Sequence, residues 1–148
     1  RRLELRGSAA GVSVYDDFAH HPTAMRTTIN GLRRQIDARW DPATQARPRI
    51  LAVFEPRSNT MKQGTMKAQL PWALEEADLS FCHSGGLDWD AAQALAPLGK
   101  LASVSDRIDT LVAGVVTAAQ PGDHVLCMSN GGFGGVHGLL LKALAAQG

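Results

Sequence analysis

The sequence predicts an α/β fold of Rossmann-like type, with a mostly parallel sheet and helices on both faces. Residues 49–54 are a near-continuous apolar run of the kind found in central parallel strands, which are buried on both sides, and residues 123–128 are expected to form the last strand. Segments with helical spacing of apolar residues, such as 23–39 and 106–119, alternate with these runs. This alternation is typical of βαβ crossovers, in which helices pack on both faces of a parallel sheet.

The beginning of the chain predicts two strands followed by a helix. Residues 2–5 and 12–15 alternate enough to form strands, with the Gly-Ser-Ala-Ala-Gly run of residues 7–11 as their turn. The helix is expected at residues 23–39, with Pro22 in its first turn, where proline is favoured. Its apolar face carries Ile29, Leu32 and Ile36.

The middle of the chain repeats the strand–helix alternation. A loop at residues 40–48 leads into the apolar strand at 49–54. A helix is expected at residues 60–76, with an interruption near Pro71, because proline removes a backbone donor inside a helix. A third core strand is expected at residues 77–82.

The last part of the chain completes the pattern. Helices are expected at residues 90–98 and 106–119, and the last strand at residues 123–128. A Gly-rich loop at residues 129–135 then leads into an apolar helix that reaches Ala146.

Length and composition narrow the possible functions. The 148 residues are most simply one domain, 1–148, which is long enough to bury its own core. A net charge of +1 gives no indication of a nucleic-acid or membrane partner. There is also no apolar run of about 18 residues that could cross a membrane. Cys82 and Cys127 lie outside any C-x-x-C motif, and we expect buried thiols in a reducing, cytoplasmic compartment.

Two acids and two histidines follow the strand expected at residues 12–15. Ligands bind at the carboxyl ends of strands in open α/β sheets, so this segment lies on the functional edge. Asp16 and Asp17 are adjacent and should point to opposite faces, so they are not expected to form a catalytic pair. One should face a cleft, and the other should cap a helix or pair with a base. A metal site at His20 and His21 is disfavoured, because adjacent histidines rarely converge on one ion.

The same segment resembles a known family. Asp-Asp-Phe-Ala-His-His-Pro-Thr, residues 16–23, is similar to the signature that opens the C-terminal domain of the Mur ligases. These are ATP-dependent enzymes that form amide bonds in peptidoglycan synthesis. Residues 54–62 and 128–135 resemble the branch that joins UDP-N-acetylmuramate to the recycled murein tripeptide L-Ala-γ-D-Glu-meso-diaminopimelate. The resemblance implies that residues 1–148 are the C-terminal fragment of a longer multidomain ligase.

The resemblance also implies three ATP-binding residues. Asp17 falls on the acidic residue that contacts the ribose hydroxyls, for which a carboxylate is a suitable acceptor. Arg2 matches the second arginine of a paired-arginine motif that reaches ATP, and a guanidinium suits phosphate oxygens. His20 is placed near the nucleotide, although His21 remains an alternative. Without the resemblance, Asp17 would equally be a helix cap and Arg2 a solvated chain end.

Two further loops are expected to bind the substrate peptide. Arg57, Ser58 and Asn59 follow the central strand, and an arginine among small polar side chains can bind a carboxylate bidentately. The alternative is a polar connection whose last residues cap the next helix. Asn130 and Gly131 belong to the Gly-rich loop, which lacks the Gly-Lys-Ser/Thr ending of a Walker A motif. Glycine there would let the backbone approach a peptide, or it would simply form a tight turn.

The expected function is therefore the nucleotide- and peptide-contacting domain of a ligase that works through an acyl phosphate. The resemblance places the P-loop, the Mg²⁺ ligands and the UDP-sugar site in the N-terminal and central domains. No catalytic residue and no metal site are expected in this fragment, which should be inactive alone. Two alternatives stay open: the L-alanine-adding ligase of the same family, and a free-standing Rossmann-like domain that binds a small molecule.

Overall fold

A computed structural model describes residues 2–56 and 63–147 of the chain. In chain order the elements are β1 (Glu4–Ala9), β2 (Val12–Asp17), α1 (Pro22–Arg39), β3 (Ile50–Phe54), α2 (Gln63–Ala73), β4 (Leu79–His83), α3 (Ala91–Leu95), the 3₁₀ helix η1 (Ala96–Leu101), β5 (Ala102–Ser105), α4 (Ile108–Ala118), β6 (His124–Met128), the 3₁₀ helix η2 (Phe133–Gly135) and α5 (Val136–Gln147). Within this part of the chain, six strands form one sheet in the order β1-β2-β6-β3-β4-β5.

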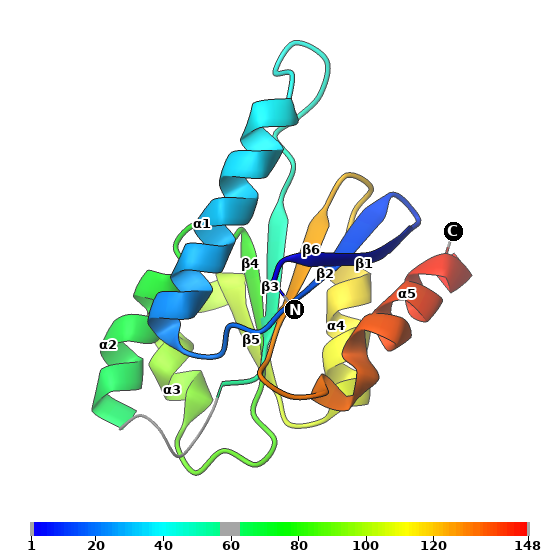
Figure 1. Cartoon of the computed structure of the whole chain (residues 1–148). Coiled ribbons are helices and arrows are strands. Elements are labelled where there is room, and N and C mark those ends of the chain that lie inside the picture. Colours follow the sequence, from blue (N-terminus) through cyan, green and yellow to red (C-terminus); the bar gives the residue numbers. More distant parts are fainter. Residues whose placement is uncertain (1, 57–62, 148) are drawn as a thin grey trace.

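The sheet is parallel except at one edge. β2, β6, β3, β4 and β5 run in the same direction, and only β1 is antiparallel to its neighbour β2. Helices α1, α2 and α3 cover one face, and α4 and α5 cover the other (Figure 1). The predicted α/β fold with a mostly parallel sheet is therefore confirmed. The carboxyl ends of the parallel strands meet at one border, which we call the carboxyl edge.

The position of β3 inside the sheet explains why its sequence is continuously apolar. Ile50, Ala52 and Phe54 pack into the core beneath α1, α2 and α3. Leu51 and Val53 point the other way, into the core beneath α4 and α5. All five side chains are fully buried, because β3 lies between β6 and β4 with helices on both faces.

The N-terminal hairpin differs from the expected one. β1 continues to Ala9, and the turn consists of Ala10 and Gly11, which both have positive φ angles. The expected turn over Gly-Ser-Ala-Ala-Gly is therefore wrong. Gly7 lies inside the strand, where an added Cβ would be 3.2 Å from Leu141 Cδ1 on α5. That glycine serves the close approach of a helix rather than a turn.

Helix α2 runs through Pro71, so the expected interruption and the extension to residue 76 are both wrong. Pro71 lies only two residues before the end of the helix at Ala73. A proline so close to the end removes little of the hydrogen-bond ladder that follows it. The chain then leaves the helix through a tight turn, in which the backbone N–H of Leu74 donates to the carbonyl of Pro71 at 3.2 Å.

Strand β5 has no counterpart in the prediction. Its sequence is Ala-Ser-Val-Ser, which carries little of the apolar signal of a strand, and its residues are only partly buried or exposed. It pairs with β4 alone and lies at the border of the sheet, where one side stays uncovered. The helix expected at residues 90–98 is also shorter. It begins after Asp90, whose side chain accepts from Gln93 N at 3.0 Å, and it gives way to η1.

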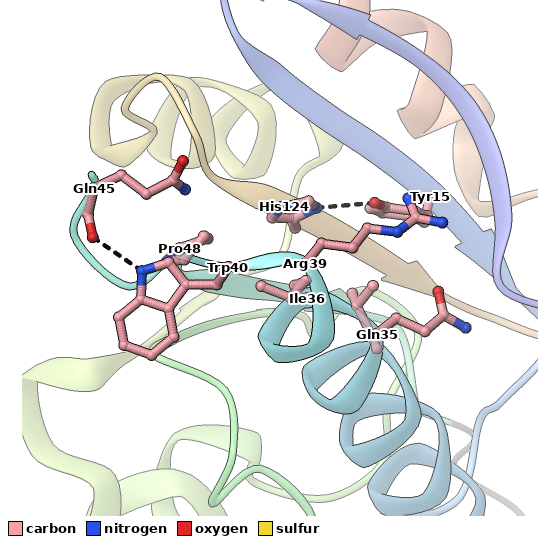
Figure 2. Close-up of a pocket in the computed structure, with 9 residues that line it drawn as sticks. Tyr15, Gln35, Ile36, Arg39, Trp40, Gln45, Pro48 and His124 are labelled. Atoms are coloured by element: carbon pink, nitrogen blue, oxygen red, sulfur yellow. Dashed lines mark hydrogen bonds between the residues drawn. The ribbon is translucent and has the colours of Figure 1, made fainter. Parts of the chain in front are cut away.

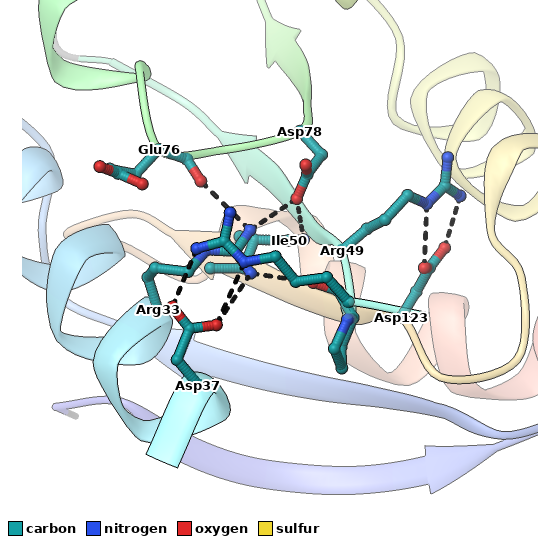
Figure 3. A network of polar contacts seen from close by, with 9 residues as sticks. Arg33, Asp37, Arg49, Ile50, Glu76, Asp78 and Asp123 are labelled. Carbon is teal, nitrogen blue, oxygen red and sulfur yellow. Dashed lines mark hydrogen bonds and ion pairs between the residues drawn. The ribbon is translucent and has the colours of Figure 1, made fainter. Parts of the chain in front are cut away.

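Two arginine–aspartate pairs lie at the opposite border of the sheet, where the parallel strands begin (Figure 3). We call this border the amino edge. Arg33 on α1 donates to Asp78 Oδ2 at 2.7 Å, and the backbone N–H of Ile50 donates to the same oxygen at 2.7 Å. Arg49 binds Asp123 through two nitrogens, at 3.0 and 2.6 Å. These pairs join α1 to β3 and β4, and β3 to β6.

None of the described helices is long and apolar enough to cross a membrane.

Candidate functional site

The carboxyl edge contains a cleft of about 810 Å³ between the N-terminal segment, the loop after β2 and helix α1. We call it the α1 cleft. Arg2, Asp17 and His20 all line it, together with Thr28 and Arg34. The structure therefore brings the three predicted ATP-binding residues to one cavity. Arg2 reaches it because β1 pairs with β2, which places the N-terminal segment beside the end of β2.

Asp17 holds three segments together at the base of the α1 cleft. Its carboxylate accepts from the backbone N–H of Leu3 at 2.7 Å and of Ala19 at 2.8 Å, and from the hydroxyl of Thr28 at 3.2 Å. A carboxylate has about four acceptor positions, so about one remains for a ligand. Asp17 is not the helix cap, since the N-cap of α1 is His21 and makes no side-chain cap bond.

Aromatic rings form the mouth of the same cleft. His20 Nδ1 donates to the carbonyl of Phe18 at 3.0 Å, which fixes the imidazole against the loop. The His20 and His21 rings lie 4.2 Å apart, and Phe18 meets His20 edge-on at 5.4 Å. Desolvation and the neighbouring His20 lower the pKa of His21, so its neutral form is favoured. The rings offer flat surfaces on which a planar ligand can stack.

Asp16 points to the other face of the sheet, as predicted for a neighbour of Asp17. His137 Nε2 on α5 lies 3.0 Å from Asp16 Oδ1, and Arg6 lies 3.6 Å from Asp16 Oδ2. Asp16 thus pairs with basic groups and has no place in the α1 cleft. The expectation that the two carboxylates do not form a catalytic pair agrees with this geometry.

A second cavity on the carboxyl edge lies between the ends of β3, β4 and β6. It measures about 270 Å³, and we call it the β3–β6 cleft. Its described lining consists of Glu55, Pro56, Gly85, Gly86, Leu87, Asn130 and Gly131. Two predicted substrate-binding residues, Asn130 and Gly131, are therefore placed here. Arg57, Ser58 and Asn59 lie outside the described residues.

Glu55 connects three strands beside the β3–β6 cleft. Ser129 Oγ donates to Glu55 Oε1 in a short hydrogen bond, and the backbone N–H of Gly131 donates to Ser129 Oγ at 3.0 Å. On the other side, His83 Nδ1 lies 3.6 Å from Glu55 Oε2. The sequence-based site did not include Glu55 or His83. Each of the two residues lies where an apolar strand ends. This position along the sequence could have predicted that both reach the carboxyl edge.

The Gly-rich loop divides into two parts. Gly134 has a φ of +57°, and an added Cβ would lie 3.1 Å from Ile108 Cγ1, so a tight turn requires glycine there. Gly135, with a φ of +69°, belongs to the same turn. Gly131 differs, because its nearest neighbour would be Glu55 Oε1 at 3.8 Å, an ordinary contact. The end of the loop is thus a structural turn, and only its beginning borders the β3–β6 cleft.

A third, smaller cavity of about 140 Å³ lies near the C-terminal end of α1 (Figure 2). Tyr15 OH and His124 Nδ1 share a hydrogen bond of 2.8 Å, and Arg39 approaches the same pair. Burial raises the pKa of Tyr15 and lowers the pKa of His124. None of the sequence-predicted site residues lines this cavity.

Within residues 2–56 and 63–147, no three His, Cys, Asp or Glu side chains are grouped as metal ligands.

The chain matches a family of ligases. Residues 1–131 match the family model described as "Mur ligase, glutamate ligase domain". The chain belongs to the Mur ligase family, and the predicted resemblance is confirmed.

The chain is similar to individual members of one branch of this family. The chain is 49% identical to the UDP-N-acetylmuramate–L-alanyl-γ-D-glutamyl-meso-2,6-diaminoheptandioate ligase of Escherichia coli, over 99% of this chain and 31% of that protein. The crystal structure of a murein peptide ligase from Psychrobacter arcticus superposes with a TM-score of 0.83, at 36% identity over 98% of this chain and 30% of that one. The chain thus spans about a third of the length of these relatives.

A crystallised domain offers a match over its full length. It comes from a Haemophilus ducreyi protein assigned the same ligase activity, with a TM-score of 0.79 and 42% identity, and the match covers 97% of this chain and 100% of that one. The L-alanine-adding branch is more distant. The UDP-N-acetylmuramate–L-alanine ligase of Mycolicibacterium vanbaalenii is 37% identical over 88% of this chain and 27% of that protein.

Proposed function

We propose that this chain is the C-terminal domain of an ATP-dependent ligase that joins UDP-N-acetylmuramate to the murein tripeptide L-Ala-γ-D-Glu-meso-diaminopimelate. The observation that carries this proposal is the 49% identity to the Escherichia coli ligase of that activity, which extends over 99% of the chain. The match therefore includes all three segments on which the sequence-based resemblance rested. We also propose that the full-length enzyme is cytoplasmic and has no nucleic-acid or membrane partner.

In this proposal, the α1 cleft receives part of ATP. Asp17 would accept from a ribose hydroxyl through its remaining acceptor position, and the Arg2 guanidinium would pair with phosphate oxygens. His20, held by the Phe18 carbonyl, would border the nucleotide. Support comes from the convergence of Arg2, Asp17 and His20 on one cavity large enough for a substantial part of a nucleotide. Mg²⁺, when bound, neutralises phosphate charge, and its ligands are proposed to lie in the central domain.

The β3–β6 cleft would receive part of the incoming peptide. ATP phosphorylates the carboxylate of UDP-N-acetylmuramate, and the alanine amine then attacks the acyl phosphate, so that an amide forms and phosphate leaves. Asn130 and Gly131 would border the peptide through the backbone of the Gly-rich loop. Arg57, Ser58 and Asn59 are proposed from the sequence to bind a peptide carboxylate. The N-terminal and central domains of the full-length protein would supply the P-loop and the UDP-sugar site, so residues 1–148 should be inactive alone.

Two other functions are less well supported. An L-alanine-adding ligase would use the same fold, but the Mycolicibacterium vanbaalenii enzyme of that activity is 37% identical, against 49% for the tripeptide ligase. A free-standing small-molecule-binding domain is disfavoured, because the relatives carry the matching sequence as about 30% of longer chains.

The choice between the two ligase activities can be tested with the full-length protein. Purified enzyme is incubated with ATP, Mg²⁺ and UDP-N-acetylmuramate, and with either the tripeptide or L-alanine. Mass spectrometry identifies the product, and phosphate release gives the rate. We expect the tripeptide adduct to form. Formation of only the L-alanine adduct would assign the protein to the other branch.

A further inference from the structure

The carboxylate of Glu55 is both anchored and accessible. One oxygen accepts from Ser129, at the end of β6, and the other faces His83, at the end of β4. The side chain nevertheless remains 29% exposed and lines the β3–β6 cleft. Contacts to two neighbouring strands limit its rotamers, so its charge is held at a defined place in the cavity.

Gly85 leaves space for the side chain of His83, which faces Glu55. An added Cβ at Gly85 would lie 2.9 Å from His83 Nε2 and 3.0 Å from the Asp106 carbonyl oxygen, so a side chain there would force the imidazole or the backbone to shift. Glycine therefore leaves room for the imidazole, whose other nitrogen approaches Glu55. His83 is thus a positioning residue, which holds the carboxylate from the β4 side.

Among the described lining residues of the β3–β6 cleft, the charged side chain is that of Glu55. The other described lining residues are three glycines, Pro56, Leu87 and Asn130, none of which is charged. A carboxylate held in place at a cavity attracts a cation, above all one that can donate hydrogen bonds. About 270 Å³ is enough for one amino-acid side chain but not for a whole tripeptide.

We propose that Glu55 binds the side-chain ammonium group of the diaminopimelate residue and so determines the specificity for the third residue of the peptide. The inference rests on the proposed function. The tripeptide has a second amine, on alanine, but that amine must lose its proton before it can attack. A carboxylate partner would stabilise the protonated, unreactive form of the attacking amine. Glu55 therefore suits the ammonium group that takes no part in the reaction.

The test compares three peptides with the full-length enzyme and its Glu55→Gln variant. The peptides are L-Ala-γ-D-Glu-meso-diaminopimelate, the analogue with L-lysine in the third position, and the dipeptide L-Ala-γ-D-Glu. Loss of a charge-assisted hydrogen bond should raise the KM of the diaminopimelate and lysine tripeptides by about 10-fold or more. The KM of the dipeptide, which lacks the ammonium group, should change little. Glu76→Gln is the matched control, since Glu76 is exposed and precedes β4 at the amino edge.

Each outcome separates the possibilities. An equal loss of kcat with all three peptides, at unchanged KM, would overturn the inference and make Glu55 part of the reaction chemistry or of the scaffold. A rise in KM for the diaminopimelate peptide alone would also overturn it, because lysine carries the same ammonium. If Glu55→Gln does not fold, Glu55→Asp decides: retained preference for the tripeptides over the dipeptide supports the inference, and equal use of all three overturns it. Wild-type enzyme that uses only L-alanine would instead refute the proposed function.

Discussion

His137 on α5 and Asp16 on β2 form a buried pair, with 3.0 Å between His137 Nε2 and Asp16 Oδ1. Both side chains are less than a tenth exposed, and Arg6 on β1 adds a contact of 3.6 Å to the other carboxylate oxygen. The pair joins the last helix to the strand that carries Asp17 to the α1 cleft. It also explains how two adjacent aspartates have different roles, since only one of them faces the cleft.

Replacement of His137 should therefore destabilise the domain strongly. His137→Ala removes a basic partner from the buried Asp16 carboxylate, and the loss of one partner of a buried pair typically costs about 3–5 kcal/mol. Urea unfolding of the 148-residue chain, followed by circular dichroism, measures the loss. Arg107→Ala is the control, because the Arg107–Asp109 pair is exposed and its loss should leave the midpoint nearly unchanged. Equal midpoints for the two variants would contradict the structural role of His137.

A similar contrast is expected at the amino edge. Arg33→Ala removes a buried guanidinium that binds Asp78 and the carbonyl of Pro48, and we expect a loss of roughly 2–4 kcal/mol. Arg47→Ala removes an exposed guanidinium from its pair with Asp37, and the melting temperature should hardly change. Thermal melts of both variants test the difference. A similar melting temperature for both would mean that the network in Figure 3 contributes little to stability.

Asp17 should affect both stability and ATP use. Asp17→Ala leaves the backbone N–H groups of Leu3 and Ala19 without their acceptor, which costs about 1–3 kcal/mol for each buried donor. Asp17→Asn retains one oxygen for these donors, and its melting temperature should fall less. In the full-length enzyme, Asp17→Asn should still raise the ATP KM by about 10-fold or more, through the loss of a charged acceptor. Unchanged ATP kinetics in a folded variant would remove Asp17 from the proposed site.

His124 should make the fold less stable in mild acid. Burial lowers the pKa of His124 in the folded chain, so the unfolded chain binds a proton more readily. The stabilisation is complete above the ordinary histidine pKa of about 6.5, and it is lost as pH falls through the lower folded pKa. His124→Gln can still accept from Tyr15, and it should lose less stability than wild type between pH 7 and pH 5. Parallel pH profiles of urea unfolding would show that His124 is not responsible.

Arg57 remains a prediction from the sequence. If it grips a peptide carboxylate, Arg57→Lys should raise the tripeptide KM by about 10-fold or more, because lysine lacks the planar fork. The KM values for ATP and UDP-N-acetylmuramate should change little, and so should the melting temperature. A normal tripeptide KM with reduced stability would make Arg57 a structural residue of the loop after β3.

Much of the fold could be predicted from local patterns along the chain. The apolar runs that became β3 and β6, and the spacing of Ile29, Leu32 and Ile36 on α1, each reflect burial within one element. The sequence patterns gave wrong predictions where an element is only partly buried, or where a residue that usually breaks an element is tolerated. β5 is an edge strand with little apolar content, and Pro71 lies close enough to a helix end to be tolerated. Gly7 looked like a turn residue, although its role is contact with Leu141 on α5.

The sequence by itself determined which residues reach the carboxyl edge, because polar residues at the end of a buried parallel strand, or within two residues after it, lie there. Asp17 and Asn130 follow this rule. Only the tertiary structure decided which of these residues meet. Arg2 joins Asp17 because β1 pairs back on β2, and Glu55 meets His83 and Ser129 because β4 and β6 flank β3. The physical reason is that strand order and register depend on long-range pairing, whereas periodicity along the chain reports only which side of each element is buried.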